Sequence, residues 1–223
     1  MQELITVHSD PDFLLFVKPG GLLAVPGRGP EKQDCLVNRV KAIFPDCIEQ
    51  PAVHRLDMAT SGLMLLARNS VAHRRLSRQF ETRQVHKEYL ALLDGKVSEK
   101  QGRIELAFRL DPDNRPHQIY DPLQGKTGIS HWKNLGCIDG RSLILFRPVT
   151  GRTHQLRLHA SHPKGLGIPI AGDYLYGNAK DGDPMFLHAS RLSFFHPKDG
   201  RRLEFSSLPP WLPEVEAEEP KAL

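Results

Sequence analysis

The most informative stretch of this chain spans residues 54–62 and has the sequence His54-Arg55-Leu56-Asp57-Met58-Ala59-Thr60-Ser61-Gly62. It lies between two apolar segments, residues 51–53 and 63–67. A carboxylate in such a setting must be solvated, paired or chemically used, because a buried unpaired charge is costly. Asp57 therefore pairs with Arg55, caps the turn that follows, or performs chemistry.

The composition indicates a globular protein with enough length for a substantial core. The chain has 223 residues, of which 39% are apolar and 25% are charged. Neither a repeat nor a Gly/Ser-rich hinge divides the sequence. We therefore expect residues 1–210 to form a single domain.

The sequence favours a cytoplasmic protein without a membrane segment. Its apolar runs are far too short to cross a bilayer. The first residues lack the basic and long apolar regions of a secretory signal. Three widely spaced cysteines, Cys35, Cys47 and Cys137, suit a reducing compartment better than a disulfide framework.

Charge is distributed unevenly between the body of the chain and its end. Residues 211–223 hold four glutamates and one lysine, so residues 1–210 carry +7 although the whole chain carries +4. We expect the acidic, proline-containing end to be a flexible tail. The basic body is compatible with a polyanionic partner.

Hydrophobic patterns predict more strands than helices. The helix expected over 35–44 has apolar residues every fourth position, and the helix over 70–83 begins with Ser70 as a cap. A third helix begins near Thr153. Strands are expected over residues 13–17, 61–68, 88–93, 103–110, 129–132, 142–149, 186–195 and 203–205. This order predicts an α+β fold with a largely antiparallel sheet, and a long functional loop over 111–128.

Two stretches carry charge of almost one sign. Residues 68–87 contain six Lys/Arg residues and one acid, and residues 141–157 contain four arginines and no acid. Exposed helices usually alternate charge signs, so these stretches favour a surface that binds a phosphate backbone.

A second motif, residues 150–159, contains Arg152, His154 and Arg157 after a glycine. At helical pitch, Arg157 would lie one turn beyond Thr153 and His154, at a helix start that favours anions. The histidines at 154, 159 and 162 do not have a standard zinc spacing, so no metal site is expected. A third motif, Lys87-Glu88-Tyr89, offers an aromatic ring that either belongs to the core or stacks on a base.

Taken in order, these segments resemble the motifs of the RluA-type pseudouridine synthases. A fourth segment, Lys18-Pro19-Gly20-Gly21-Leu22, resembles the Lys-Pro-x-Gly-Leu segment of that family. The resemblance extends from about Thr6 to Leu208. It implies a pseudouridine synthase fold, with a mixed, largely antiparallel sheet flanked by helices and loops and an active-site cleft across the sheet. The chain starts directly at this catalytic domain, so no additional S4 domain is expected.

The resemblance also implies a reaction and roles for individual residues. Asp57 would act on the ribose as nucleophile or base, Tyr89 would stack on the flipped uracil and assist proton removal, and Arg157 would pair with Asp57. Arg55 would fill the gap left by the flipped base. Further RNA contacts are expected from His54, Lys18, Arg28, Arg115, Arg152 and His154. The isomerisation needs no cofactor and no metal, and we expect a monomer.

Residues 25–28, Met58-Ala59 and residues 114–118 resemble the dual-specificity branch of the family, whose members act on tRNA and large-subunit rRNA. That branch implies a uridine in a tRNA anticodon stem-loop and one in a 23S rRNA hairpin as targets. A synthase for a single tRNA or rRNA site is the alternative within the family. A non-catalytic RNA-binding module and a nucleoside-cleaving hydrolase are alternatives of other classes.

Overall fold

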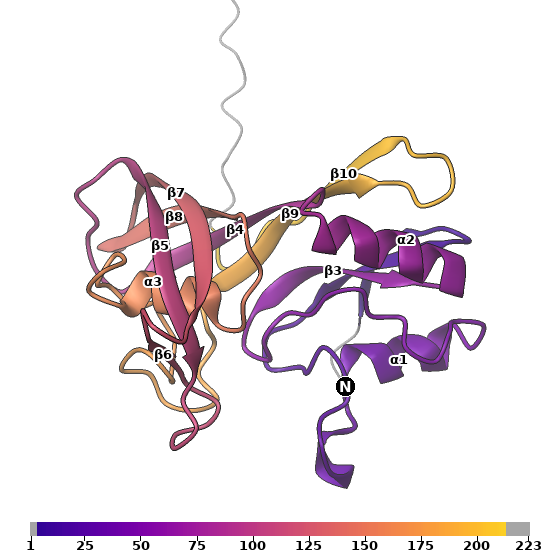
Figure 1. Cartoon of the computed structure of the whole chain (residues 1–223), viewed down its shortest axis with the longest axis horizontal. Coiled ribbons are helices and arrows are strands. Elements are labelled where there is room, and N and C mark those ends of the chain that lie inside the picture. Colours follow the sequence, from indigo (N-terminus) through magenta and orange to yellow (C-terminus); the bar gives the residue numbers. More distant parts are fainter. Residues whose placement is uncertain (1–3, 213–223) are drawn as a thin grey trace, which may run out of the picture.

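One large sheet organises the chain. The computed structural model describes residues 4–212, and in that range ten strands pair in the order β1-β2-β3-β9-β4-β8-β7-β5-β6, with β10 paired to β9 (Figure 1). The strands are β1 (Ile5–Ser9), β2 (Phe13–Lys18), β3 (Ser61–Ala67), β4 (His86–Leu93), β5 (Gln101–Leu110), β6 (Gln118–Tyr120), β7 (Lys126–Ile138), β8 (Arg141–Pro148), β9 (Leu187–Phe195) and β10 (Arg202–Ser206). The helices are α1 (Leu36–Ile43), α2 (Ser70–Glu81) and α3 (Gln155–Ser161), with a 3-10 turn at Pro30–Lys32.

Strand pairing confirms the expected α+β fold with a largely antiparallel sheet. The pair β3–β9 is parallel, and the other strand pairs in the described range are antiparallel. Every strand and helix expected from the sequence is present. Two strands were missed: β1, which is largely exposed and lacks an apolar run, and β6, which has three residues inside the expected loop over 111–128.

Two helix starts differ from the sequence-based prediction. Asn69, not Ser70, caps α2, because its side chain accepts a hydrogen bond from the Ala72 amide. Helix α3 begins at Gln155 rather than near Thr153, because His154 adopts a left-handed conformation with a φ of 55°. Thr153 and His154 therefore do not share a helical face with Arg157.

The core has three clusters of buried side chains. On β2, Leu14 and Phe16 belong to the cluster beneath α1, whereas Phe13 and Leu15 belong to the cluster beneath α2. This alternation follows the two-residue period of a strand. Because both faces of β2 and β3 are covered, their sequences are continuous apolar runs rather than alternating ones.

The third cluster packs α3 against the other half of the sheet, which contains β4, β5, β7 and β8. Figure 1 shows this half on the left and the α1–α2 half on the right, with β4 and β9 running between them. Between Leu4 and Leu212, no helix has the length and apolar character that crossing a membrane requires. The predicted flexible tail lies outside the described residues from position 213 onward.

The side chain of His159 predicts a specific acid sensitivity. It is fully buried in α3 with its ring edge-on to Phe108, and neither ring nitrogen has a hydrogen-bond partner within residues 4–212. Burial lowers its pKa to about 4. Since an unfolded histidine has a pKa of about 6.5, the unfolded state binds a proton first. The associated stability is lost as the pH falls from about 6.5 towards 4.

We expect His159→Leu to have the same thermal midpoint as the wild type at pH 7.5. Between pH 7.5 and pH 5, its free energy of unfolding should fall by about 1–2 kcal/mol less than that of the wild type. Thermal unfolding at both pH values measures this difference. The exposed His131 provides the control His131→Leu, which should retain the acid sensitivity of the wild type. Equal acid sensitivity of His159→Leu and the wild type would contradict the assignment.

Candidate active site

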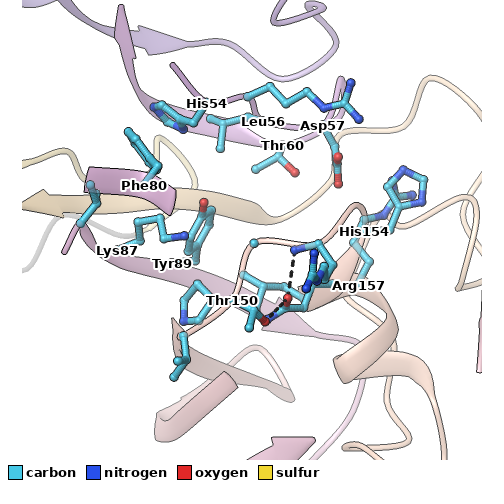
Figure 2. A pocket seen from close by; sticks show the side chains of 18 of the residues that line it. His54, Leu56, Asp57, Thr60, Phe80, Lys87, Tyr89, Thr150, His154 and Arg157 are labelled. Atoms are coloured by element: carbon cyan, nitrogen blue, oxygen red, sulfur yellow. Dashed lines mark hydrogen bonds between the residues drawn. The ribbon is translucent and has the colours of Figure 1, made fainter. Parts of the chain in front are cut away.

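A cavity of about 480 Å³ opens where the loop before β3, the start of β4 and the segment between β8 and α3 meet (Figure 2). Its wall brings together most of the residues that the sequence marked. Asp57 enters from the loop before β3, Tyr89 from β4, and Arg157 from α3. Three segments distant in sequence thus meet at one site.

The Asp57 carboxylate points into this cavity. Its backbone belongs to a tight turn, in which the Thr60 amide donates to the Asp57 carbonyl oxygen at 3.1 Å. The side chain is half-buried, and in the described part of the chain it makes no hydrogen bond or ion pair. Asp57 therefore presents a carboxylate whose charge is available to a ligand.

Lys18 fixes the turn that carries Asp57. Its fully buried Nζ donates to the carbonyl oxygens of Pro19 at 2.8 Å, Leu22 at 2.7 Å and Met58 at 3.0 Å. Burial lowers the pKa of Lys18 to about 7, while the charge of Asp57 acts in the opposite direction. The expected RNA contact of Lys18 is wrong, because a side chain enclosed by carbonyl oxygens does not reach a ligand.

His54 supports the cavity wall instead of offering a cation to RNA. Its Nε2 accepts a hydrogen bond from the Leu65 amide at 2.9 Å, and its ring stacks on Phe80 at a centroid distance of 4.6 Å. Burial, together with the nearby charge of Lys87, lowers its pKa to about 3. The neutral imidazole therefore links the Asp57 loop to β3 and α2.

The expected ion pair between Arg157 and Asp57 is wrong, since Arg157 pairs with Asp173. The guanidinium donates from Nε to Oδ2 at 2.8 Å and from Nη2 to Oδ1 at 2.6 Å, and both side chains are buried. Burial opposes the charge of Arg157, but the hydrogen bonds and charge of Asp173 outweigh it and raise the pKa of Arg157. Arg157 still lines the cavity that Asp57 enters, now as a fixed cation.

Asp173 and Tyr176 also belong to this site, although no motif in the sequence predicts them. Asp173 lies in the apolar and aromatic stretch 170–176 with no basic neighbour, a pattern that calls for a basic partner from elsewhere in the chain. Tyr176 places its ring 5.3 Å from the Arg157 guanidinium, and its hydroxyl lies 2.8 Å from His154 Nδ1. Together they hold α3 and the residue before it in place.

His154 is buried in this network, and burial lowers its pKa. It lines the cavity as a neutral ring, so it does not provide the anion-binding charge expected at a helix start. The turn before it is held by Gln155, whose Oε1 accepts from the Thr150 hydroxyl at 2.7 Å and the Arg152 amide at 3.0 Å (dashed in Figure 2). This turn leaves the Arg152 side chain exposed at the cavity mouth.

Tyr89 lines the same cavity as Asp57 (Figure 2). Burial, followed by the charge of Asp57, raises the pKa of Tyr89 above its ordinary value. The side chain is therefore a neutral phenol at physiological pH. Its aromatic face and hydroxyl are the features it can offer to a base.

The remaining predicted RNA-binding arginines are exposed. Arg55 lines the cavity, and its Nη2 lies 3.5 Å from Thr153 Oγ1 in the segment between β8 and α3. Arg28 and Arg115 lie on loops and do not line the cavity. The structure thus divides the predicted contacts into those at the site and those remote from it.

Potential metal ligands cluster elsewhere in the described part of the chain, at Asp10, Asp12 and His196. Asp10 accepts a hydrogen bond from the Asp12 amide, and His196 Nδ1 accepts one from the Lys198 amide. These atoms already stabilise turns.

Comparison with known proteins agrees with the RluA-type resemblance. A family model described as RNA pseudouridylate synthase matches residues 12–162. A Pasteurella multocida protein named "Dual-specificity RNA pseudouridine synthase RluA" is 42% identical over 207 residues, covering 91% of this chain and 92% of the relative. The Escherichia coli K12 protein of the same name is 36% identical over 208 residues, covering 92% of each.

A solved structure shares the fold. The protein titled "Human RNA Pseudouridylate Synthase Domain Containing 1" is 31% identical, with a TM-score of 0.77. The match covers 96% of this chain and 87% of that one.

The buried pair predicts a large energetic coupling between Arg157 and Asp173. Asp173→Ala leaves an uncompensated guanidinium in the interior, so we expect it to destabilise the fold by about 3–5 kcal/mol. Arg157→Ala in the Asp173→Ala background should cost far less than it does alone.

Chemical denaturation of both single variants and the double variant measures this coupling. The exposed pair Lys41–Glu49 serves as the control and should show a coupling below about 1 kcal/mol. A coupling as small as that of the control pair would show that Asp173 does not hold Arg157.

Proposed function

This chain belongs to the RNA pseudouridylate synthase family and isomerises uridine to pseudouridine in RNA, and from this premise we propose that Asp57 is its catalytic carboxylate. Two acids line the cavity, Asp57 and Glu81. Glu81 is exposed at the end of α2, whereas Asp57 is half-buried and its carboxylate points into the cavity. The observation that carries the proposal is the unpaired Asp57 carboxylate in this cavity.

The reaction explains why an unpaired carboxylate is needed. The bond between the ribose and the ring nitrogen breaks, the uracil turns, and a bond forms between the ribose and a ring carbon. A proton leaves that carbon and another is placed on the nitrogen, so atoms and electrons balance within the substrate. A carboxylate next to the ribose serves as nucleophile or as the base that removes a ribose proton.

Tyr89 and Arg157 complete the proposed site. The target uridine must leave its stack before Asp57 can reach the ribose, at a cost of a few kcal/mol. Tyr89 stacks on the extruded uracil and assists proton removal from the ring carbon, and Arg55 occupies the space that the base vacates. Arg157, fixed by Asp173, supplies positive charge to the cavity that the Asp57 carboxylate enters.

The relatives indicate the substrates. The Pasteurella multocida and Escherichia coli relatives carry the name "Dual-specificity RNA pseudouridine synthase RluA", and this chain covers 92% of each of them. We infer that this enzyme modifies a uridine in a tRNA anticodon stem-loop and one in a 23S rRNA hairpin, as a cytoplasmic monomer. Arg152 contacts RNA at the cavity mouth, and Arg28 and Arg115 contact it outside the cavity. Modification of a single tRNA or rRNA site is the alternative within the family.

We expect Asp57→Asn to abolish pseudouridine formation in a uridine-containing RNA hairpin while preserving RNA binding and the thermal midpoint. The amide keeps the shape of the side chain but removes its charge and nucleophilicity. Glu81→Gln is the matched control at the same cavity and should retain wild-type activity. Product is measured by nuclease digestion and chromatography of the nucleosides.

The same assay separates the classes of function. A synthase yields the isomer without a change in mass, a hydrolase releases free uracil, and a binding module leaves the RNA unchanged. Wild-type activity of Asp57→Asn would refute the role of Asp57.

For Tyr89, two substitutions separate stacking from proton transfer. Tyr89→Phe keeps the ring, so we expect unchanged RNA affinity and a fall in kcat of about 100-fold, the lower end of general acid–base effects. Tyr89→Leu should additionally weaken RNA binding, because it loses the stacking surface. Single-turnover kinetics and filter binding measure the two effects, and a wild-type rate for Tyr89→Phe would exclude the hydroxyl from the reaction.

A further inference from the structure

A second cavity, of about 430 Å³, adjoins the first. The two cavities share five lining residues, which lie at the start of β4 and the end of β8: Arg83, Val85, Lys87, Pro148 and Val149. The two cavities are therefore neighbours along one shared wall.

Strand pairing explains why this space exists. Strand β4 pairs with β8 from Tyr89 to Leu93, but over His86–Glu88 it pairs with β9 alone. The end of β8 pairs instead with β7, where Arg147 lies opposite His131. The pairing of β4 with β8 thus ends at Tyr89, next to the register shift between Glu88 and Tyr89 in the pairing of β4 with β9.

The second cavity is strongly basic. Among residues 4–212, five Lys/Arg side chains line it against two carboxylates, Glu88 and Glu204. Glu88 accepts from Arg147 at 2.7 Å and lies 3.5 Å from Arg191, so one acid faces two arginines. The lining therefore retains an excess of positive charge.

Lys87 stands at the junction of the two cavities. It is half-buried, and within residues 4–212 its ammonium has no hydrogen bond or ion pair. Burial lowers its pKa, as expected for a cation held from water without a counter-charge. By contrast, Lys18 and Arg157 are satisfied by neighbouring groups of the protein.

We propose that the second cavity binds the phosphate backbone of the substrate RNA next to the flipped uridine, with Lys87 contacting the phosphate at the junction. The proposal rests on the assignment of the first cavity as the uridine site. A nucleotide in that site continues as a phosphate-linked strand, and the shared wall leads this strand into the second cavity. The arginines in the second cavity outnumber its carboxylates, so positive charge remains available to bind phosphates.

The test compares two double variants that remove equal charge. Arg191→Gln with Arg202→Gln removes two cations from the second cavity, and Lys41→Gln with Arg141→Gln removes two that line neither cavity. We expect the first variant to bind a substrate stem-loop about 10-fold more weakly at fixed salt, with a shallower dependence of affinity on salt. Its kcat at saturating RNA should equal that of the wild type.

An RNA with one uncharged backbone linkage tests where the phosphate contact lies. A methylphosphonate next to the target uridine should weaken binding by the wild type, but it should have much less effect on Lys87→Gln, which has already lost the contact. Equal affinity and salt dependence for the two double variants, or equal loss for the wild type and Lys87→Gln, would overturn the proposal. Pseudouridine formation by the wild type tests the uridine site separately from the second cavity.

Discussion

The buried ammonium of Lys18 is the constraint on which the active site depends. A charge fully removed from water must be satisfied, and three carbonyl oxygens, one of them from Met58, satisfy it. These bonds tie the end of β2 to the turn that carries Asp57. Because Lys18 is satisfied by carbonyl oxygens and Arg157 by Asp173, the Asp57 carboxylate has no partner in the part of the chain that the structure describes. Asp57 is available to a substrate because the neighbouring cations, Lys18 and Arg157, bind other groups of the protein.

Both cavities lie where the pairing of β4 with β8 ends. Tyr89 at the last β4–β8 pair and Lys87 beyond it line the first cavity, which we propose holds the uridine, and Lys87 also lines the basic second cavity. In this account, the early end of the β4–β8 pairing provides both a place for the base and a path for the backbone. Recognition by phosphate contacts and chemistry at the ribose are adjacent for this reason.

The sequence predicted the fold class, most elements and the residues that converge at the site, because hydrophobic periodicity and motif order are local signals. It failed where a side chain's partner is distant. Lys18 looked like an RNA contact and Arg157 like the partner of Asp57, since neither the carbonyl cage nor Asp173 is visible from local sequence. The start of α3 was misplaced because nothing in the sequence marks His154 for a left-handed conformation.

The central claim is that the unpaired Asp57 carboxylate reacts at the ribose. A structure of the enzyme bound to a uridine-containing stem-loop tests it most directly. The account predicts an extruded uridine stacked on Tyr89, with an Asp57 oxygen about 3–3.5 Å from a ribose carbon or its proton-bearing neighbour. A uridine bound in the cavity with its ribose turned away from Asp57, or Asp57 engaged by Arg157 in place of the substrate, would contradict it.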